Sequence, residues 1–264
     1  MRPLAEFPAL ARRRVSSVLC DIDDTLTSDG RLTAAAYAAM ESLKNAGLRV
    51  VPVTGRPAGW CDHIARMWPV DAVVGENGAF WFRYDHAARK MRRRYVEDGA
   101  ARAANRKKLA AVGERILAAV PGCAIAADQQ YREADLAIDF CEDVPRLAGS
   151  AVARIVALMQ EAGLTARVSS IHVNGWFGGY DKLGMTKMLF AECFGIDLDA
   201  DNAQVAFIGD SPNDAPMFGF FRNSVGVANV RAFADTLEAS PAWITRAASG
   251  AGFCEFAEAM LAAR

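Results

Sequence analysis

Three acidic residues stand directly after a short apolar run near the start of the chain. Val15 to Cys20 is followed at once by Asp21-Ile22-Asp23-Asp24-Thr25. Such a run is typical of a buried strand that delivers carboxylates to the crevice at its carboxyl end, where open α/β sheets bind their ligands. Clustered carboxylates repel one another and prefer water to a protein interior. We therefore expect a cation beside them.

A second apolar run ends in the same way much later in the chain. Val205 to Gly209 precedes Asp210, and Asn213 and Asp214 follow within four residues. Adjacent parallel strands would bring both oxygen-rich loops to one edge of a sheet, and oxygen ligands of this kind suit Mg²⁺. A divalent ion there could hold a phosphoryl oxygen opposite a carboxylate nucleophile. The alternative is that each acid is only a turn former or a helix cap.

Four motifs, in order, resemble those of the haloacid dehalogenase-like superfamily. They are Asp21-Ile22-Asp23-Asp24-Thr25, Thr54, Lys182 and Gly209-Asp210-Ser211-Pro212-Asn213-Asp214. The match anchors residues 15–84 and 180–264. The resemblance implies an α/β fold with a Rossmann-like parallel sheet and helices on both of its faces.

The resemblance also implies a role for each motif residue. Asp21 would be the nucleophile that forms an aspartyl-phosphate, and Asp23 the general acid and base. Thr54 would donate to a phosphoryl oxygen, and Lys182 would offset charge between nucleophile and phosphate. The implied ligands of Mg²⁺ are the Asp21 carboxylate, the Asp23 backbone carbonyl and Asp210, with Asn213 and Asp214 in support.

Two points in the motifs stay open. Lys187 is a rival for the cationic role, and Lys182 is preferred because it stands at the predicted start of a helix, near the sheet edge. The residue after the second aspartate is usually glycine in this family and is Asp24 here. That difference leaves the catalytic pair intact and concerns the conformation of the loop. Asp24 itself receives no role.

The order of predicted elements indicates one α/β domain interrupted by an insert. Thr33 is a plausible N-cap for a helix that runs to about Ala46, and Pro57 suits the first turn of the next. The β-loop-α alternation stops near residue 85 and resumes at Lys182. Residues 1–85 and 179–264 are therefore expected to form the catalytic core, and residues 86–178 an α+β insert.

The place of the insert resembles that of a type IIB cap. Thr54 and Lys182 are 128 positions apart, whereas Asp21 and Thr54 leave no room for a separate unit. Relatives with that cap include Cof-like sugar phosphatases, sucrose-phosphate and mannosyl-3-phosphoglycerate phosphatases, and phosphomannomutases of the eukaryotic type. The presence of Asp23 argues against a dehalogenase, which lacks that acid.

The insert is expected to select the leaving group, because the core holds only the phosphoryl moiety. In the insert, Ser170, His172 and Asn174 share one face of a strand by alternation, although simple exposure to solvent is the alternative. The full set of candidate substrate contacts in the insert and on the core loops is Thr25, Arg56, Asn77, Arg132, Glu133, Ser170, His172 and Asn174.

Composition excludes several other classes of function. The chain has 264 residues with 30 basic and 31 acidic side chains, which does not favour capture of nucleic acid. No apolar run approaches the length of a membrane span, and Pro3, Glu6 and Pro8 interrupt any signal peptide. The six cysteines are dispersed, as reduced core cysteines are. We expect a cytoplasmic protein without a membrane partner. The basic run Lys90 to Arg94 is either a solvated edge or a means to steer an anionic substrate.

The sequence therefore predicts a Mg²⁺-dependent phosphatase. It would hydrolyse a small phosphorylated metabolite, a sugar or glycosyl phosphate, through an aspartyl-phosphate. One alternative is a phosphomutase of the phosphomannomutase type, and another is a non-catalytic module that binds sugar phosphates. Neither a P-loop nor a dinucleotide-binding glycine motif is present. The oligomeric state is left open.

Overall fold

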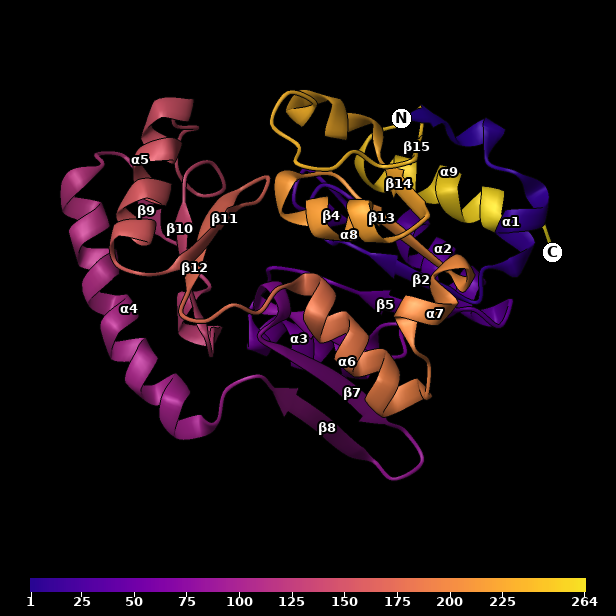
Figure 1. Ribbon diagram of the computed structural model, residues 1–264, viewed down its shortest axis with the longest axis horizontal. Helices are drawn as coiled ribbons and strands as arrows, with labels where there is room; N and C mark the ends of the chain where they lie inside the picture. Colours follow the sequence, from indigo (N-terminus) through magenta and orange to yellow (C-terminus); the bar gives the residue numbers. More distant parts are fainter.

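A six-stranded parallel sheet organises the larger part of the computed structural model, which describes residues 1–264 (Figure 1). The parallel sheet confirms the α/β class expected from the sequence. Its strands, in spatial order, are β1 (Arg2–Pro3), β15 (Trp243–Ile244), β14 (Asn223–Gly226), β13 (Val205–Gly209), β2 (Ser17–Cys20) and β5 (Arg49–Pro52).

Helices cover both faces of this sheet because its central strands are apolar on both faces. Along β2, Val18 and Cys20 join one apolar cluster, and Leu19 between them joins the other. The first face is covered by α2 (Ala34–Asn45), α3 (Ala58–Met67) and α9 (Ser249–Leu261), with α1 (Ala9–Arg14) beside α9. The second face is covered by α6 (Lys182–Phe194), α7 (Leu198–Asp201) and α8 (Ala215–Phe220).

The pairing of β2 with β13 is the element of the fold that creates the site. Cys20 is in register with Ile208, and the Asp21 N–H donates to the Ile208 carbonyl at 2.9 Å. The acids that follow each strand therefore emerge side by side. The helix expected after this region also forms, since the Thr33 hydroxyl accepts the Ala36 N–H at 3.2 Å and caps α2.

A smaller antiparallel sheet extends the core below the main one in Figure 1. Its strands are β6 (Val73–Gly75), β7 (Phe80–Asp85) and β8 (Lys90–Tyr95), and the turn η2 (Glu76–Gly78) joins the first two. β8 carries the basic run Lys90 to Arg94 as a largely exposed edge strand. The sequence reading assigned no strand there, because its charged residues show no apolar alternation. A short hairpin of β3 (Thr27–Ser28) and β4 (Arg31–Leu32) follows the first acidic loop.

A second unit lies to the left of the core in Figure 1, and we call it the cap. It consists of α4 (Gly99–Ala119), α5 (Gly149–Glu161) and a four-stranded antiparallel sheet whose strands, in spatial order, are β11 (Thr165–Val168), β12 (His172–Trp176), β10 (Asp135–Asp139) and β9 (Ala124–Ile125). The cap has an apolar core of its own between the helices and the sheet. β8 falls inside the predicted insert 86–178 but pairs with β7 of the core. The division of the chain at residue 86 stays a prediction.

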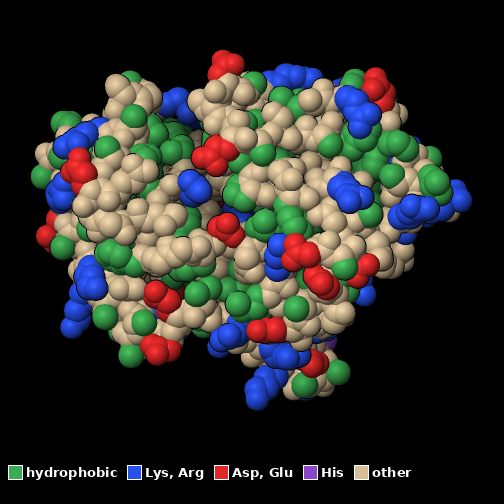
Figure 2. Space-filling model, in the orientation of Figure 1, with side chains coloured by type: hydrophobic (Ala, Val, Ile, Leu, Met, Phe, Trp, Pro, Cys, Tyr) green, Lys and Arg blue, Asp and Glu red, His purple; other side chains and the backbone are tan.

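The surface agrees with the near balance of charges. Figure 2 shows acidic and basic side chains interspersed over both units, with apolar groups scattered among them. None of the helices combines the length and the apolar character needed to cross a membrane.

The turn η2 brings the start of α6 against the core. Glu76, Asn77 and Gly78 have positive φ angles of 43°, 53° and 105°. A Cβ atom on Gly78 would lie 2.0 Å from the carbonyl oxygen of Asp181, the residue that caps α6. Only glycine permits this close approach, which places Lys182 at the edge of the parallel sheet.

We expect Gly78→Ala to destabilise the protein, since it adds both backbone strain and a steric clash. The loss in the free energy of unfolding should be roughly 2–4 kcal/mol, measured by urea denaturation. Gly163→Ala is the matched control, because Gly163 has a φ of 82° but no atom within 4 Å of an added Cβ. It should show the backbone strain alone, about 1 kcal/mol. Equal losses in the two variants would contradict the proposed contact.

Candidate active site

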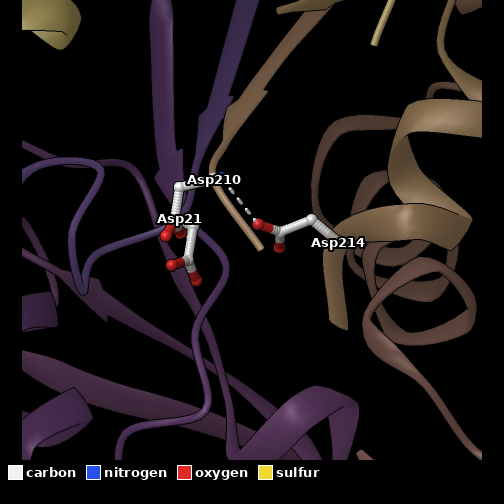
Figure 3. A group of neighbouring side chains, drawn as sticks. All are labelled: Asp21, Asp210 and Asp214. Atoms are coloured by element: carbon white, nitrogen blue, oxygen red, sulfur yellow. Dashed lines mark hydrogen bonds between the residues drawn. The ribbon is translucent and has the colours of Figure 1, made fainter. Parts of the chain in front are cut away.

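Three buried carboxylates meet at the carboxyl end of β2 and β13. Asp21, Asp210 and Asp214 each place an oxygen within 4.8 Å of the others, and all three side chains are nearly inaccessible to solvent. Figure 3 shows Asp21 and Asp210 extending from neighbouring strands and Asp214 approaching from the loop after β13. The edge where the two acid-tipped strands meet is thus the most acidic buried region of the core.

One lysine compensates this charge in part. The Lys182 Nζ donates to Asp21 Oδ1 at 2.8 Å and to Asp214 Oδ1 at 2.7 Å. Asp214 also accepts the Asp210 N–H at 3.1 Å, which fixes the loop around it. The rival lysine, Lys187, lies one turn further along α6 and pairs with the exposed Asp199 at 2.7 Å.

The electrostatics of the cluster call for a further cation. Burial, with added repulsion from Asp214 and Asp23, raises the pKa of Asp21 to about 8 even though Lys182 opposes the shift. Burial and the neighbouring Asp21 also raise the pKa of Asp210 well above its usual value. One ammonium group faces three carboxylates, and the atoms that could bind a metal ion are all carboxylate oxygens. This donor set fits a divalent ion such as Mg²⁺.

Asp23, two residues beyond Asp21, is bound by an arginine instead. The Arg56 Nε donates to both Asp23 oxygens at 2.9 and 3.0 Å, and the Arg56 Nη2 donates to Oδ1 at 2.8 Å. Arg56 follows Thr54 at the end of β5. The buried Thr54 hydroxyl accepts the Arg56 N–H at 3.0 Å, so its own proton is left to donate elsewhere.

The backbone at position 24 explains why the family that this sequence resembles usually has glycine there. Asp24 has a φ of 54°, a left-handed conformation that aspartate tolerates better than most residues. Thr25 is buried, and its hydroxyl donates to Asp210 Oδ1 at 3.3 Å. The structure therefore places this candidate substrate contact beside the carboxylates, on the core side.

Asparagines complete the rim of the cluster. The Asn213 Nδ2 donates to Asn77 Oδ1 at 3.4 Å, and the buried Nδ2 of Asn77 has no partner of its own. Asn229, in the turn η6 (Ala228–Phe233), donates to Asp210 Oδ2 at 3.3 Å and to the Asp24 carbonyl at 3.0 Å. The sequence reading missed Asn229, because it lies outside the four motifs and follows no apolar strand directly.

The cap closes over this cluster. A cleft between the units has a free volume of about 10 Å³, which is near the least that one water molecule needs. No substrate fits while the cap is in this position. The residues around the cleft are Asp21, Asp23, Gly55, Arg56, Ser169, Ile171, His172, Asn174 and Asn213.

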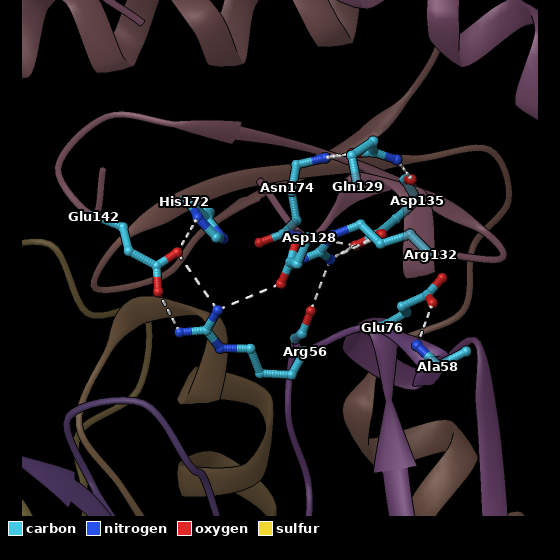
Figure 4. A network of polar contacts seen from close by, with 12 residues as sticks. Arg56, Ala58, Glu76, Asp128, Gln129, Arg132, Asp135, Glu142, His172 and Asn174 are labelled. Carbon is cyan, nitrogen blue, oxygen red and sulfur yellow. Dashed lines mark hydrogen bonds and ion pairs between the residues drawn. The ribbon is translucent and has the colours of Figure 1, made fainter. Parts of the chain in front are cut away.

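A charged network joins the cap to Arg56 (Figure 4). The Arg56 Nη2 donates to Glu142 Oε1 at 2.6 Å, and the Arg56 Nη1 donates to Asp128 Oδ2 at 3.4 Å. The His172 Nε2 lies 2.9 Å from Glu142 Oε2. Burial opposes ionisation of Glu142, but His172 and Arg56 outweigh it and lower the pKa of Glu142 to about 2. The sequence reading missed Glu142 and Asp128, which lie in cap loops without a motif.

Several candidate substrate contacts of the cap have protein partners in the structure. Arg132 is buried and donates to Asp128, Asp135 and the Gly55 carbonyl at 2.9–3.2 Å. The Asn174 Nδ2 donates to Asp135 at 2.9 Å. These contacts stabilise the cap itself and, through Arg132 and Gly55, its packing against the core.

The two remaining candidates lie in different surroundings. The Glu133 carboxylate pairs with the exposed Arg106 at 3.1 Å and lies 3.6 Å from Arg102, outside the residues that line the cleft. The Ser170 hydroxyl is buried and has no hydrogen-bond partner. Their contacts with a substrate stay predictions.

A third carboxylate that the sequence reading missed connects the core to the cap. Glu76 is fully buried, and its carboxylate accepts the N–H groups of Ala58 at 2.9 Å, Glu133 at 2.9 Å and Ala134 at 2.6 Å. Burial and the nearby Asp135 raise the pKa of Glu76 to about 8, against the pull of Arg132 and these hydrogen bonds. The turn Gly75 to Gly78 was interpreted only as a turn signal.

Part of the chain matches a family model, and its fold is similar to those of solved proteins. Residues 18–103 match the family model of haloacid dehalogenase-like hydrolases. A HAD/COF-like hydrolase from Plasmodium vivax has a similar fold, with a TM-score of 0.69 and 17% identity over 97% of this chain and 99% of that one. Sucrose-phosphatase from Synechocystis is similar with a TM-score of 0.62 and 14% identity over 94% and 98% of the two chains.

A sugar phosphatase of HAD subclass IIB also has this fold, with a TM-score of 0.59 and 16% identity over 94% of this chain and 98% of that one. No curated protein matches the sequence. The family model covers the first two motifs, and the solved structures cover the core and the cap together. Residues 18–103 are thus similar to the haloacid dehalogenase-like hydrolases, and the chain as a whole has the fold of solved HAD hydrolases, a subclass IIB sugar phosphatase among them.

Proposed function

We propose that this protein is a Mg²⁺-dependent phosphatase that hydrolyses a small phosphorylated metabolite, a sugar or glycosyl phosphate. The observation that carries the proposal is the Asp21 carboxylate, held by Lys182 at 2.8 Å inside a buried acidic cluster. Asp23 lies two residues further on and lines the same cleft. A nucleophile and a separate proton carrier are what two-step phosphoryl transfer to water requires.

In the first step, an Asp21 oxygen would form a bond to phosphorus while the bond between phosphorus and the ester oxygen breaks. Lys182 binds Oδ1 of Asp21, which leaves the other oxygen free to attack. Asp23 would supply a proton to the departing alkoxide. In the second step, Asp23 would take a proton from water as that water attacks phosphorus, which releases phosphate and restores Asp21.

Asp21 and Asp210, with the Asp23 carbonyl, would hold the Mg²⁺ ion, and Asn213 and Asp214 would support them. When bound, the ion would neutralise negative charge on the phosphoryl oxygens and on the carboxylates around them. Thr54 keeps a hydroxyl proton for the phosphoryl group, since its oxygen already accepts the Arg56 N–H. Lys182 spans nucleophile and Asp214 and keeps Asp21 in place.

The substrate class is supported by the polar walls of the cleft and by the comparisons. His172 and Asn174 of the cap line it together with Asp23 and Asn213 of the core, and such donors and acceptors suit hydroxyl groups. Sucrose-phosphatase and a subclass IIB sugar phosphatase share the fold. In this proposal the core, residues 1–85 and 179–264, performs the chemistry and residues 86–178 select the leaving group. A phosphomutase would differ in requiring a bisphosphorylated activator.

Asp21→Asn should abolish phosphate release while the fold survives, because the amide is a poor nucleophile of nearly the same shape. We expect a fall in kcat of at least about 10³-fold, measured on a panel of phosphorylated metabolites with Mg²⁺. Asp199→Asn is the control, since Asp199 is an exposed acid paired with Lys187. It should retain full activity. Equal rates in the two variants would exclude Asp21 as the nucleophile.

Mg²⁺ should stabilise the protein more at about pH 8 than at about pH 6. A carboxyl group with a raised pKa favours folding while it is protonated, and this contribution is lost as the pH rises toward 8, the pKa of Asp21. The metal binds the ionised form, so it competes with protons at low pH and relieves repulsion at high pH. Thermal unfolding with and without Mg²⁺ measures the effect, and Asp210→Asn should diminish it. A metal-induced rise in Tm that does not depend on pH would contradict this ligand set.

A further inference from the structure

The cap must move before a substrate can enter, because the cleft is closed. The main polar contacts between the units form two groups. One group surrounds Glu76 and the other surrounds Arg56, and Figure 4 shows Glu76 and Glu142 at opposite ends of the network. One group lies next to the chain segments that join the cap to the core, and the other lies away from them.

The group around Glu76 lies at these joining segments. Gly78 abuts the carbonyl of Asp181, just before α6, and the Ala79 carbonyl accepts the N–H of Val96, just after β8. Glu76 itself binds the backbone of Glu133 and Ala134 in the cap. Contacts so close to both connections would change least when the cap rocks, so this side is suited to be the pivot.

The group around Arg56 lies away from the pivot and includes a residue of the proposed chemistry. The guanidinium shares its donors between Asp23 of the core and Glu142 of the cap, at 2.8 Å and 2.6 Å from Nη2. Its other face stacks on the Trp60 ring at 4.4 Å. Opening of the cap would withdraw Glu142 and leave the guanidinium held by Asp23 and Trp60 alone.

We propose that Glu142 is a positioning residue: closure of the cap brings its carboxylate to Arg56, and Arg56 thereby orients Asp23 for proton transfer. The proposal rests on the proposed phosphatase function. A guanidinium is planar, and its donors bind carboxylates in a fixed fork. Anchoring one side of that fork on Glu142 sets the plane in which the other side binds Asp23. Proton transfer would thus be aligned only after the substrate has been enclosed.

This role makes a specific kinetic demand. Asp23 protonates the leaving oxygen in the proposed mechanism, and this proton transfer accelerates the reaction more when the leaving group is more basic. A nitrophenolate departs readily without a proton, whereas a phenolate or an alkoxide does not. Loss of the Glu142 contact should therefore slow substrates with basic leaving groups and spare those with acidic ones. A residue that only stabilises the fold would affect all substrates alike.

The test is kcat/KM for a series of substituted phenyl phosphates, which reports phosphoryl transfer to Asp21. These leaving groups differ in basicity and carry no hydroxyl that Glu142 could bind directly. For Glu142→Ala we expect a loss of roughly tenfold or more with phenyl phosphate and less than about threefold with p-nitrophenyl phosphate. Glu142→Gln should lie between Glu142→Ala and the wild type, because its amide oxygen still accepts from Arg56.

Glu161→Ala is the matched control. Glu161 is a cap glutamate that pairs with Arg154 at 3.2 Å and also with Arg115. Both of these partners belong to the cap, and neither is Arg56. It should leave the dependence on leaving group unchanged. Arg56→Lys should steepen that dependence, and adding Glu142→Ala to it should cost little more, since both changes break one chain of contacts.

A separate measurement keeps the test independent of catalysis. Small-angle X-ray scattering should give a larger radius of gyration for Glu142→Ala than for the wild type and Glu161→Ala, because the cap loses its shortest contact with Arg56 and keeps only the longer one from Asp128. A uniform loss of kcat/KM across the series, or an unchanged radius of gyration, would overturn the role of Glu142. A wild type that hydrolyses no phosphate ester would instead refute the proposed function, while the scattering would still test the contact.

Discussion

The burial of three carboxylates around one lysine is the constraint on which the rest of the structure depends. Water would solvate Asp21, Asp210 and Asp214 far better than the protein interior does. Lys182 offsets part of this cost by binding Asp21 and Asp214 at 2.8 and 2.7 Å. The lysine in turn depends on the close approach of Gly78 to Asp181, which sets the start of α6. Backbone packing beside the site therefore determines where its one lysine can act.

The strand order explains why residues so distant in the sequence share this site. β2 is central and pairs with β13 on one side and β5 on the other, all in parallel. The loops after these three strands hold Asp21 and Asp23, Asp210 and Asp214, and Thr54 with Arg56. The apolar residues of the strands face helices on both sides, so polar side chains can emerge only at the strand ends.

What could be predicted from the sequence follows from local patterns. Two apolar strands that end in acids sufficed to expect a carboxylate cluster, and the start of a helix sufficed to favour Lys182 over Lys187. β8 was not predicted because its basic residues carry no apolar alternation. Glu142 and Glu76 were missed for a different reason: each acts through partners that only tertiary structure supplies. The candidate roles of Arg132 and Glu133 in binding substrate stay predictions, and both side chains have protein partners here.

The polar character of the seam between core and cap is consistent with a need to open. The buried apolar clusters of the two units are separate, and charged and backbone contacts such as Arg132 with Gly55 join the units, beside a few apolar ones such as Ala134 against the core. An apolar seam would favour the closed form by about 0.8 kcal/mol for each buried methylene group. Hydrogen bonds exchanged for water differ by only about 1 kcal/mol each. A polar seam can therefore close with correct geometry and still open, and ion pairs such as Arg56 with Glu142 make closure specific without making it permanent.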